Sequence, residues 1–418
     1  MTSNEWKKCK LGDFINIKHG FAFKGEFISS EDNGNVVVTP GNFAIGGGFQ
    51  ENKCKFYIGN FPKEYILKPN DLIVTMTDLS KEGDTLGYSA KVPNSNKRIY
   101  LHNQRIGLIE FKNSNIDKNF LYWYMRTYTY QKTIIGSCTG SVIKHTSPNR
   151  ICNIEINLPP LETQQKIAKV LSAIDDKIEL NNSINNNLEQ QAQAIFKENI
   201  SKNCNNSKNG CIGDYCAVKS GFAFKGSWWQ NTGIKVIKIK TIDNDNINFN
   251  DCSYVSEDKI QYATDFIVKG GDLLIAMTGA TIGKFAIVPK VNETILVNQR
   301  VGKFFLGENP VQNLPFLYCT LKEQDVINEI INKGQGSAQP NISGSDIMNT
   351  LCYFPEKQNI VDFNNLCTPI FEKIINNKYE NYHLIKFRDT LLPKLMSGEI
   401  DVSKVDISAD ILSLSEDK

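Results

Sequence analysis

Two stretches in the second half of the chain come nearest to a catalytic signature. Gly279-Ala280-Thr281-Ile282-Gly283-Lys284-Phe285 is one residue short of a phosphate-binding loop and lacks the Ser or Thr after the lysine. A nuclease-type group of acids with a lysine has no counterpart in the first half of the chain; its members are Asp243, Asp245, Glu257 and Lys259. The Pro-Pro loop of amino-methyltransferases is also missing, because Pro159-Pro160 is followed by Leu161. We therefore expect no catalytic residue and no cofactor.

Histidines and cysteines could hold a metal ion, but their spacing argues against it. The four histidines are dispersed and do not recur at matched positions: His19, His102, His145 and His383. Eleven cysteines show no C-x-x-C spacing, and Cys204, Cys211 and Cys216 form the only cluster, with no histidine near. We expect no metal site, and free thiols in a reducing cytosol. Met1 to Leu11 contains no apolar run, so we also expect no signal peptide and a cytoplasmic location.

Three blocks of sequence occur twice, in the same order. The block pairs are Gly-Phe-Ala-Phe-Lys-Gly at 20–25 and 221–226, Asp-Leu-Ile-Val-Thr-Met-Thr at 71–77 with Asp-Leu-Leu-Ile-Ala-Met-Thr at 272–278, and Asn-Gln-Arg-Ile-Gly at 103–107 with Asn-Gln-Arg-Val-Gly at 298–302. One hexapeptide could recur by chance, but three in register indicate a duplicated domain with insertions and deletions in its loops. The function should then be one that is performed twice.

Each copy contains a strand-rich part followed by a helical part. Short apolar runs between Gly, Asn and Asp, such as Val36-Val37-Val38, Leu72-Ile73-Val74 and Ile234 to Ile239, predict strands. After Pro159-Pro160 and again after Pro355 the apolar spacing changes to three and four residues, which predicts a helix of about 35–40 residues in each copy. Pro369 should kink or interrupt the second helix.

Helices this long with a narrow apolar stripe favour a coiled coil, and the two helices are the only related partners for each other. We predict antiparallel pairing, with asparagines along the seam that weaken it but fix its orientation. The predicted seam residues are Ile167, Val170, Ile174, Ile184, Leu188 and Ile195 in the first helix, and Phe363, Leu366, Ile370, Ile374, Leu384, Phe387 and Leu391 in the second.

The sequence therefore predicts an α+β fold: two strand-rich globular domains separated by two long helices in an antiparallel coiled coil, with an internal pseudo-two-fold repeat. The predicted segments are a first domain at 1–158, a helix at 159–203, a second domain at 204–355, a helix at 356–402 and a tail at 403–418. The net charge of +2 hides an uneven distribution, because residues 1–158 carry 20 basic and 14 acidic side chains whereas residues 356–418 carry 8 and 11. Part of the surface could bind phosphate while the acidic parts contact protein.

The chain resembles the specificity subunits of type I restriction-modification systems. The likeness lies in the repeated Gly-Phe-Ala-Phe-Lys-Gly, in Pro159-Pro160-Leu161-Glu162-Thr163-Gln164-Gln165-Lys166-Ile167, and in Leu391-Leu392-Pro393-Lys394-Leu395-Met396-Ser397-Gly398-Glu399-Ile400. It implies a non-catalytic reader of double-stranded DNA, with one target-recognition domain for each half of a bipartite asymmetric sequence. It also implies a helical spacer that docks two DNA adenine methyltransferase subunits, and nuclease/translocase subunits that join for restriction.

If the two domains read different half-sites, residues common to both copies cannot specify the bases. We therefore assign Lys24, Arg105, Lys225 and Arg300 as phosphate contacts or structural anchors. Base reading should lie where the copies differ, at 39–55 against 238–252, 78–98 against 279–291, and 136–147 against 334–345. The third pair of loops contains suitable side chains, because Gln and Asn can pair with adenine and Lys with guanine. The base-reading candidates are Lys144, His145, Gln335, Gln339 and Asn341.

Two other functions remain open from the sequence. One is a specificity-like subunit that serves a methylation-only complex, without a nuclease partner. The other is a coiled-coil adaptor whose two globular heads bind protein. Salt-dependent binding to mixed-sequence duplex DNA separates the adaptor from a DNA reader.

Overall fold

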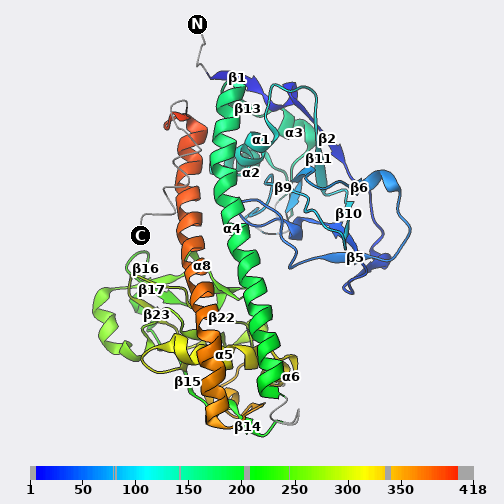
Figure 1. The fold of residues 1–418 in the computed structure, drawn as a ribbon. Coiled ribbons are helices and arrows are strands. Elements are labelled where there is room, and N and C mark those ends of the chain that lie inside the picture. The colour runs from blue at the N-terminus through cyan, green and yellow to red at the C-terminus, as the bar shows by residue number, and fades with distance from the viewer. Residues whose placement is uncertain are drawn as a thin grey trace. The chain divides into compact units, whose positions relative to one another are not determined.

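The computed structural model describes residues 6–402 apart from 79, 81, 141–142, 202–207, 244 and 335–339 (Figure 1). The chain divides into two compact units. Unit 1 consists of residues 1–176 and 385–418, and unit 2 of residues 177–384. Each unit therefore contains one strand-rich domain and a segment of each long helix. This division does not test the limits that we predicted from the sequence for the two domains, the two helices and the tail, and these limits stay a prediction.

Unit 1 is built on two sheets. The four-stranded sheet has the order β2 (Ile15–His19), β11 (Ile106–Phe111), β7 (Leu72–Thr75), β9 (Ser89–Lys91). The five-stranded sheet has the order β3 (Ile28–Ser29), β5 (Lys55–Tyr57), β4 (Asn35–Val38), β10 (Ile99–His102), β6 (Ile66–Leu67). Two further pairs are β1 (Lys7–Lys10) with β13 (Glu155–Leu158), and β8 (Thr77–Asp78) with β12 (Lys144–His145).

Unit 2 repeats the order of the first sheet and of four strands of the second sheet. Its first sheet has the order β15 (Ala217–Ser220), β24 (Val301–Phe305), β21 (Leu273–Ala276), β22 (Phe285–Ile287). Its second has the order β16 (Trp229–Gln230), β20 (Ser253–Val255), β17 (Ile234–Ile237), β23 (Ile295–Val297). The two-stranded pairs are β14 (Gly210–Cys211) with β25 (Leu351–Cys352), and β18 (Ile242–Asp243) with β19 (Asn246–Ile247). In both units one pair is parallel, β4 with β10 and β17 with β23. The sequence duplication is therefore matched by the same strand order and direction in the first sheet and in four strands of the second.

The apolar runs form strands because alternate side chains fill two different cores. In β7, Leu72 and Val74 belong to one buried cluster and Ile73 to another. In β21, Leu273 and Ile275 face one cluster while Leu274 faces a second. A strand buried on both faces has a continuous apolar sequence, which explains the repeated Asp-Leu block. The strand predictions at 36–38 and 72–74 are confirmed, whereas β17 ends at Ile237 and Ile239 lies in a short 3-10 turn.

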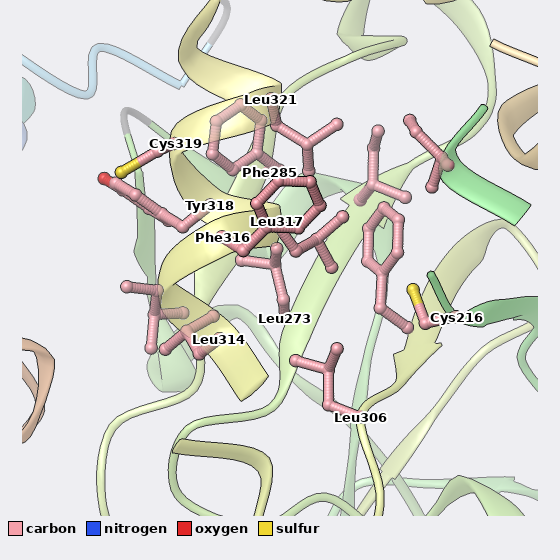
Figure 2. Packing of buried hydrophobic residues seen from close by; sticks show 14 of the residues in the cluster. Cys216, Leu273, Phe285, Leu306, Leu314, Phe316, Leu317, Tyr318, Cys319 and Leu321 are labelled. Atoms are coloured by element: carbon pink, nitrogen blue, oxygen red, sulfur yellow. The ribbon is translucent and has the colours of Figure 1, made fainter. Parts of the chain in front are cut away.

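Short helices complete each unit. They are α1 (Lys118–Tyr124), α2 (Tyr128–Ser137) and α3 (Pro148–Cys152) in unit 1, and α5 (Pro310–Lys322), α6 (Gln324–Lys333) and α7 (Gly344–Met348) in unit 2. Most of α5 is buried, and Figure 2 shows its side chains Leu314, Phe316, Leu317 and Leu321 gathered with Leu273 and Phe285. A helix that is apolar around its circumference must be covered on several sides.

The two long helices are α4 (Leu161–Phe196) and α8 (Lys357–Ser397), of 36 and 41 residues. Each begins within two residues of the proline that predicted its start. Pro369 does not interrupt α8, so the predicted interruption of this helix is wrong. A proline removes one backbone hydrogen bond and crowds the preceding turn, but Cys367 and Phe371 on either side are fully buried, and their packing holds the helix together.

Within each unit the segments of α4 and α8 run antiparallel, as Figure 1 shows in green and orange. In unit 2, Asn181 donates to Asn381 at 2.9 Å and Asn377 donates to Asn185 at 2.8 Å, so residue numbers rise in one helix as they fall in the other. All four asparagines are buried. In unit 1, Arg388 donates to Asp175 at 2.6 Å. The predicted fold of two strand-rich domains, an internal repeat and two long antiparallel helices is confirmed.

The predicted seam is wrong at two positions of α8. Leu366 is 57% exposed and Phe387 is 41% exposed. The buried face of α8 instead includes Cys367, Phe371 and Leu395. It is rotated because α8 packs against the globular core as well as against α4: the ring centroids of Phe371 and Tyr318 of α5 are 5.2 Å apart.

The other predicted seam residues lie on the inner faces of the helices to different degrees. Ile167, Ile174, Phe363 and Ile374 are buried, and the remaining ones are partly buried, namely Val170, Ile184, Leu188, Ile195, Ile370, Leu384 and Leu391.

Candidate nucleic-acid interface

In unit 1 the three repeated blocks meet at one place through backbone hydrogen bonds. The Phe21 N–H donates to His102 O at 2.8 Å, and the Gln104 N–H donates to Phe21 O at 2.9 Å. The Met76 N–H donates to Arg105 O at 2.9 Å. We call this arrangement of residues 20–25, 71–77 and 103–107 the shared frame of unit 1.

Unit 2 has the same frame, made by residues 221–226, 272–278 and 298–302. The Phe222 N–H donates to Val297 O, and the Gln299 N–H donates to Phe222 O, both at 2.9 Å. The Met277 N–H donates to Arg300 O at 3.0 Å. The repeated sequence is therefore explained by repeated backbone contacts.

The first glycine of each frame is required by close approach of the backbone. A Cβ atom on Gly20 would lie 2.3 Å from His102 O, and one on Gly221 would lie 2.5 Å from Val297 O. Real side chains do not tolerate such contacts, so the first block packs against the third only with glycine there.

The two frame arginines are held by their backbones while their side chains are exposed. The N–H of Arg105 donates to Asn103 Oδ1 at 3.0 Å, and that of Arg300 donates to Asn298 Oδ1 at 3.4 Å. Neither guanidinium has a partner among the residues that the structure describes. Both are therefore available to an anion, as a phosphate contact requires.

The two frame lysines are also exposed. Lys24 Nζ lies 3.9 Å from a Glu26 carboxylate oxygen, a loose pair. Lys225 Nζ lies 5.5 Å from the centre of the Trp228 ring, which stacks on Phe222 at 6.1 Å. Trp228 is thus a packing residue, with the Lys225 ammonium group near its ring.

Of the residues predicted in the third pair of loops, the structure places two at the frames, His145 and Asn341. His145 Nδ1 is 3.1 Å from Thr77 Oγ1, and the Thr278 hydroxyl donates to Asn341 Oδ1 at 2.9 Å. The ammonium group of Lys144 is already engaged within the protein, because its Nζ donates to Glu82 O at 3.2 Å. Gln335 and Gln339 lie outside the described residues.

Asp78 begins the second divergent loop of unit 1. Its buried carboxylate accepts hydrogen bonds from the N–H of Ser80 at 2.6 Å and from the Thr85 hydroxyl at 2.7 Å. Burial alone raises the pKa of Asp78, but the hydrogen bonds from Thr85 and Ser80 outweigh it and lower that pKa below its usual value. An ionised Asp78 therefore anchors the loop to the frame.

In unit 2 the frame surrounds a polar hollow of about 520 Å³. It is lined by Ser220, Gly221, Ala223, Thr278, Gln299, Arg300 and Asn341. Among the described residues that line this hollow, Asn341 alone lies outside the repeated blocks and the adjoining Ser220. A larger hollow of about 610 Å³ in unit 1 is lined by none of the repeated residues.

Sequence reasoning missed Ser220 and Thr278 as members of this site. Thr278 lies in a repeated block, so the repeat itself was the available signal. Among the described residues, no group of three His, Cys, Asp or Glu side chains is placed to hold a metal ion. No helix in the described part of the chain is both long and apolar enough to span a membrane.

A family model and individual relatives of the chain indicate the same protein family. A family model described as the type I restriction modification DNA specificity domain matches residues 3–190 and 205–386, one match for each copy of the repeat. The chain is 25% identical to the type I restriction enzyme MjaVIII specificity subunit of Methanocaldococcus jannaschii, over 96% of this chain and 94% of the relative. It is 24% identical to the HindI specificity subunit of Haemophilus influenzae, over 95% of this chain and 100% of the relative.

The fold is similar to the crystal structure of a type I restriction-modification system S subunit from M. genitalium. The TM-score is 0.54 at 16% identity, and the match covers 94% of this chain and 97% of that one. Since the family model matches most of the chain, in two successive copies, the chain belongs to the type I restriction-modification DNA specificity family.

Proposed function

We propose that this chain is the non-catalytic subunit that reads a bipartite, asymmetric DNA target, one half-site with each strand-rich domain. One observation carries the proposal: the same frame is built twice, with an exposed arginine in each copy, while the loops on it differ. Residues that recur can hold the phosphate backbone at both half-sites, and residues that differ can distinguish bases.

In this proposal α4 and α8 form the spacer between the half-sites and the docking surface for two DNA adenine methyltransferase subunits. Nuclease/translocase subunits join the same complex for restriction, and methyl transfer, ATP hydrolysis and cleavage belong to the partners. Exposed apolar side chains on both helices support a docking role: Leu180 is 54% exposed and Leu366 57%. Such side chains are expected where a protein partner covers them.

The first experiment is a fluorescence-anisotropy titration of the full chain with mixed-sequence duplex DNA at several salt concentrations. A DNA reader that neutralises several phosphates loses affinity steeply with salt. An adaptor with protein-binding heads shows no salt-dependent DNA binding, and that outcome would overturn the proposal.

The second experiment tests the division of labour between the domains. Residues 205–355 are exchanged for the matching domain of a relative, and the methylated motif is mapped in cells that also express the methyltransferase subunit. One half of the motif should change while the other stays. Removal of seven residues between Ile167 and Ile195 should in turn shorten the gap between half-sites or abolish methylation; an unchanged gap with full methylation would refute the spacer role.

A further inference from the structure

The two units present a different side chain from the same backbone position. The N–H of Thr146 donates to Met76 O in unit 1, and that of Ile342 donates to Met277 O in unit 2, both at 3.0 Å. The preceding residues, His145 and Asn341, pair antiparallel with the last threonine of the repeated block, Thr77 or Thr278. This register makes His145 and Asn341 structural equivalents, although no sequence motif relates them.

The threonine beneath each residue is both repeated and buried. Thr77 is 5% exposed and Thr278 is 6% exposed, and each hydroxyl lies within hydrogen-bond distance of the variable side chain. His145 and Asn341 themselves are exposed. A constant, buried hydroxyl therefore orients a variable, exposed polar group.

We infer that this position reads one base of each half-site, and that Asn341 selects adenine; the inference rests on the proposed function. Thr278 occupies one lone pair of Asn341 Oδ1, and Nδ2 has no partner among the described residues. The amide therefore keeps both a donor and an acceptor, the pair that adenine N7 and N6 require. Arg300 lines the same hollow and can hold the neighbouring phosphate, which sets the register of the base contact.

His145 offers different chemistry from the same place. Its Nδ1 is engaged by Thr77, and its Nε2 has no partner among the described residues. A single ring nitrogen makes one contact with a base edge, whereas an amide makes two. The position in unit 1 should therefore discriminate less sharply than the position in unit 2.

The test is selection of bound duplexes from a random-sequence library by the full chain, followed by sequencing. The variants are Asn341→Asp, His145→Asn and Thr278→Val, with Asn328→Asp as the matched control, because Asn328 is an exposed residue of α6 that does not line the hollow. Thermal unfolding first establishes that each variant is folded.

For Asn341→Asp we expect one base position of one half-site to change from adenine toward cytosine, since a carboxylate accepts a hydrogen bond from cytosine N4. The preference between the two bases at that position should change roughly 5- to 150-fold. His145→Asn should move one position of the other half-site toward adenine. Thr278→Val should weaken the preference at the Asn341 position only, because it removes the orienting hydroxyl. Asn328→Asp should leave the motif unchanged.

The inference is overturned if folded Asn341→Asp and His145→Asn proteins select the original motif, or if both alter the same half-site. A uniform loss of affinity for all sequences also overturns it, since that is the behaviour of a phosphate contact. Failure of the wild-type chain to select any bipartite motif is a distinct result, which would refute the proposed function itself.

Discussion

Replacement of Asp175 by Asn should destabilise unit 1 and leave unit 2 nearly unchanged. Asp175 lies on α4 between two arginines, with Arg126 Nη1 at 3.1 Å and Arg388 Nη1 at 2.6 Å. The side chains of Arg126 and Arg388 are only 7% and 15% exposed. The neutral amide would leave the largely buried Arg126 guanidinium without an ion-pair partner among the described residues, and would leave Arg388 with Asp389 alone.

Removal of one partner of a buried ion pair typically costs about 3–5 kcal/mol. The Asp175 side chain is 22% exposed and Arg388 keeps a second partner, Asp389, at 2.7 Å, so we expect a lower cost, about 2–3 kcal/mol. For a unit of this size, that corresponds to a decrease of about 5–10 °C in the midpoint of thermal unfolding. Differential scanning calorimetry measures the midpoint, and hydrogen exchange in α1 and α2 locates the loss.

The matched control is Asp176→Asn, because Asp176 is exposed at the next position of the same helix. It removes the same charge and should shift the midpoint by less than about 2 °C, as for most surface substitutions. Equal shifts for the two variants would show that helix charge, and not the arginine pair, accounts for the effect. Faster exchange confined to unit 2 would refute the assignment of the network to unit 1.

Three further results are expected. Asn381→Leu should lower the free energy of unfolding by denaturant by about 1–3 kcal/mol, because Asn181 loses an acceptor. The double change Asn181→Leu/Asn381→Leu should recover part of that loss, and additive costs of the two changes would contradict the pairing. Arg105→Ala and Arg300→Ala should each lower the slope of log affinity against log salt by about one and weaken binding to all sequences equally; a folded variant that relaxes a single base position would contradict the phosphate role. Asp78→Asn should lower the free energy of unfolding near neutral pH, and the difference from wild type should vanish on acidification. The reason is that the pKa of Asp78 is lower in the folded state than the unfolded pKa of 3.8, so the stability it contributes above that pH is lost as the pH falls through the folded pKa. A difference that persists in acid would refute this linkage.

The parts of the fold that follow from local pattern were predictable from the sequence. The repeated blocks indicated two copies of one domain, and the prolines at 160 and 355 with the apolar spacing after them indicated two long helices. These features depend on neighbours close in the chain.

Contacts between distant segments could not be predicted in the same way. The buried face of α8 depends on Phe371 meeting Tyr318 of α5, which the helical spacing of α8 alone does not contain. The equivalence of His145 and Asn341 likewise depends on backbone register against Thr77 and Thr278, since the flanking residues of the two loops differ.

The two asparagine pairs have a consequence for the ancestry of the chain. Asn181 and Asn185 lie in the helix of the first copy, and Asn377 and Asn381 lie at matching places in the helix of the second; exchange of the copies turns one pair into the other. A half-length chain with one domain and one helix would carry both members of such a pair, so two identical chains could associate through these contacts as a homodimer, with the isologous symmetry common to protein dimers. The present chain, with two successive matches to one family model, has the arrangement that duplication and fusion of such a half-length chain would produce. In a fused chain the loops that differ between the two copies can change independently of each other, which two identical chains do not allow.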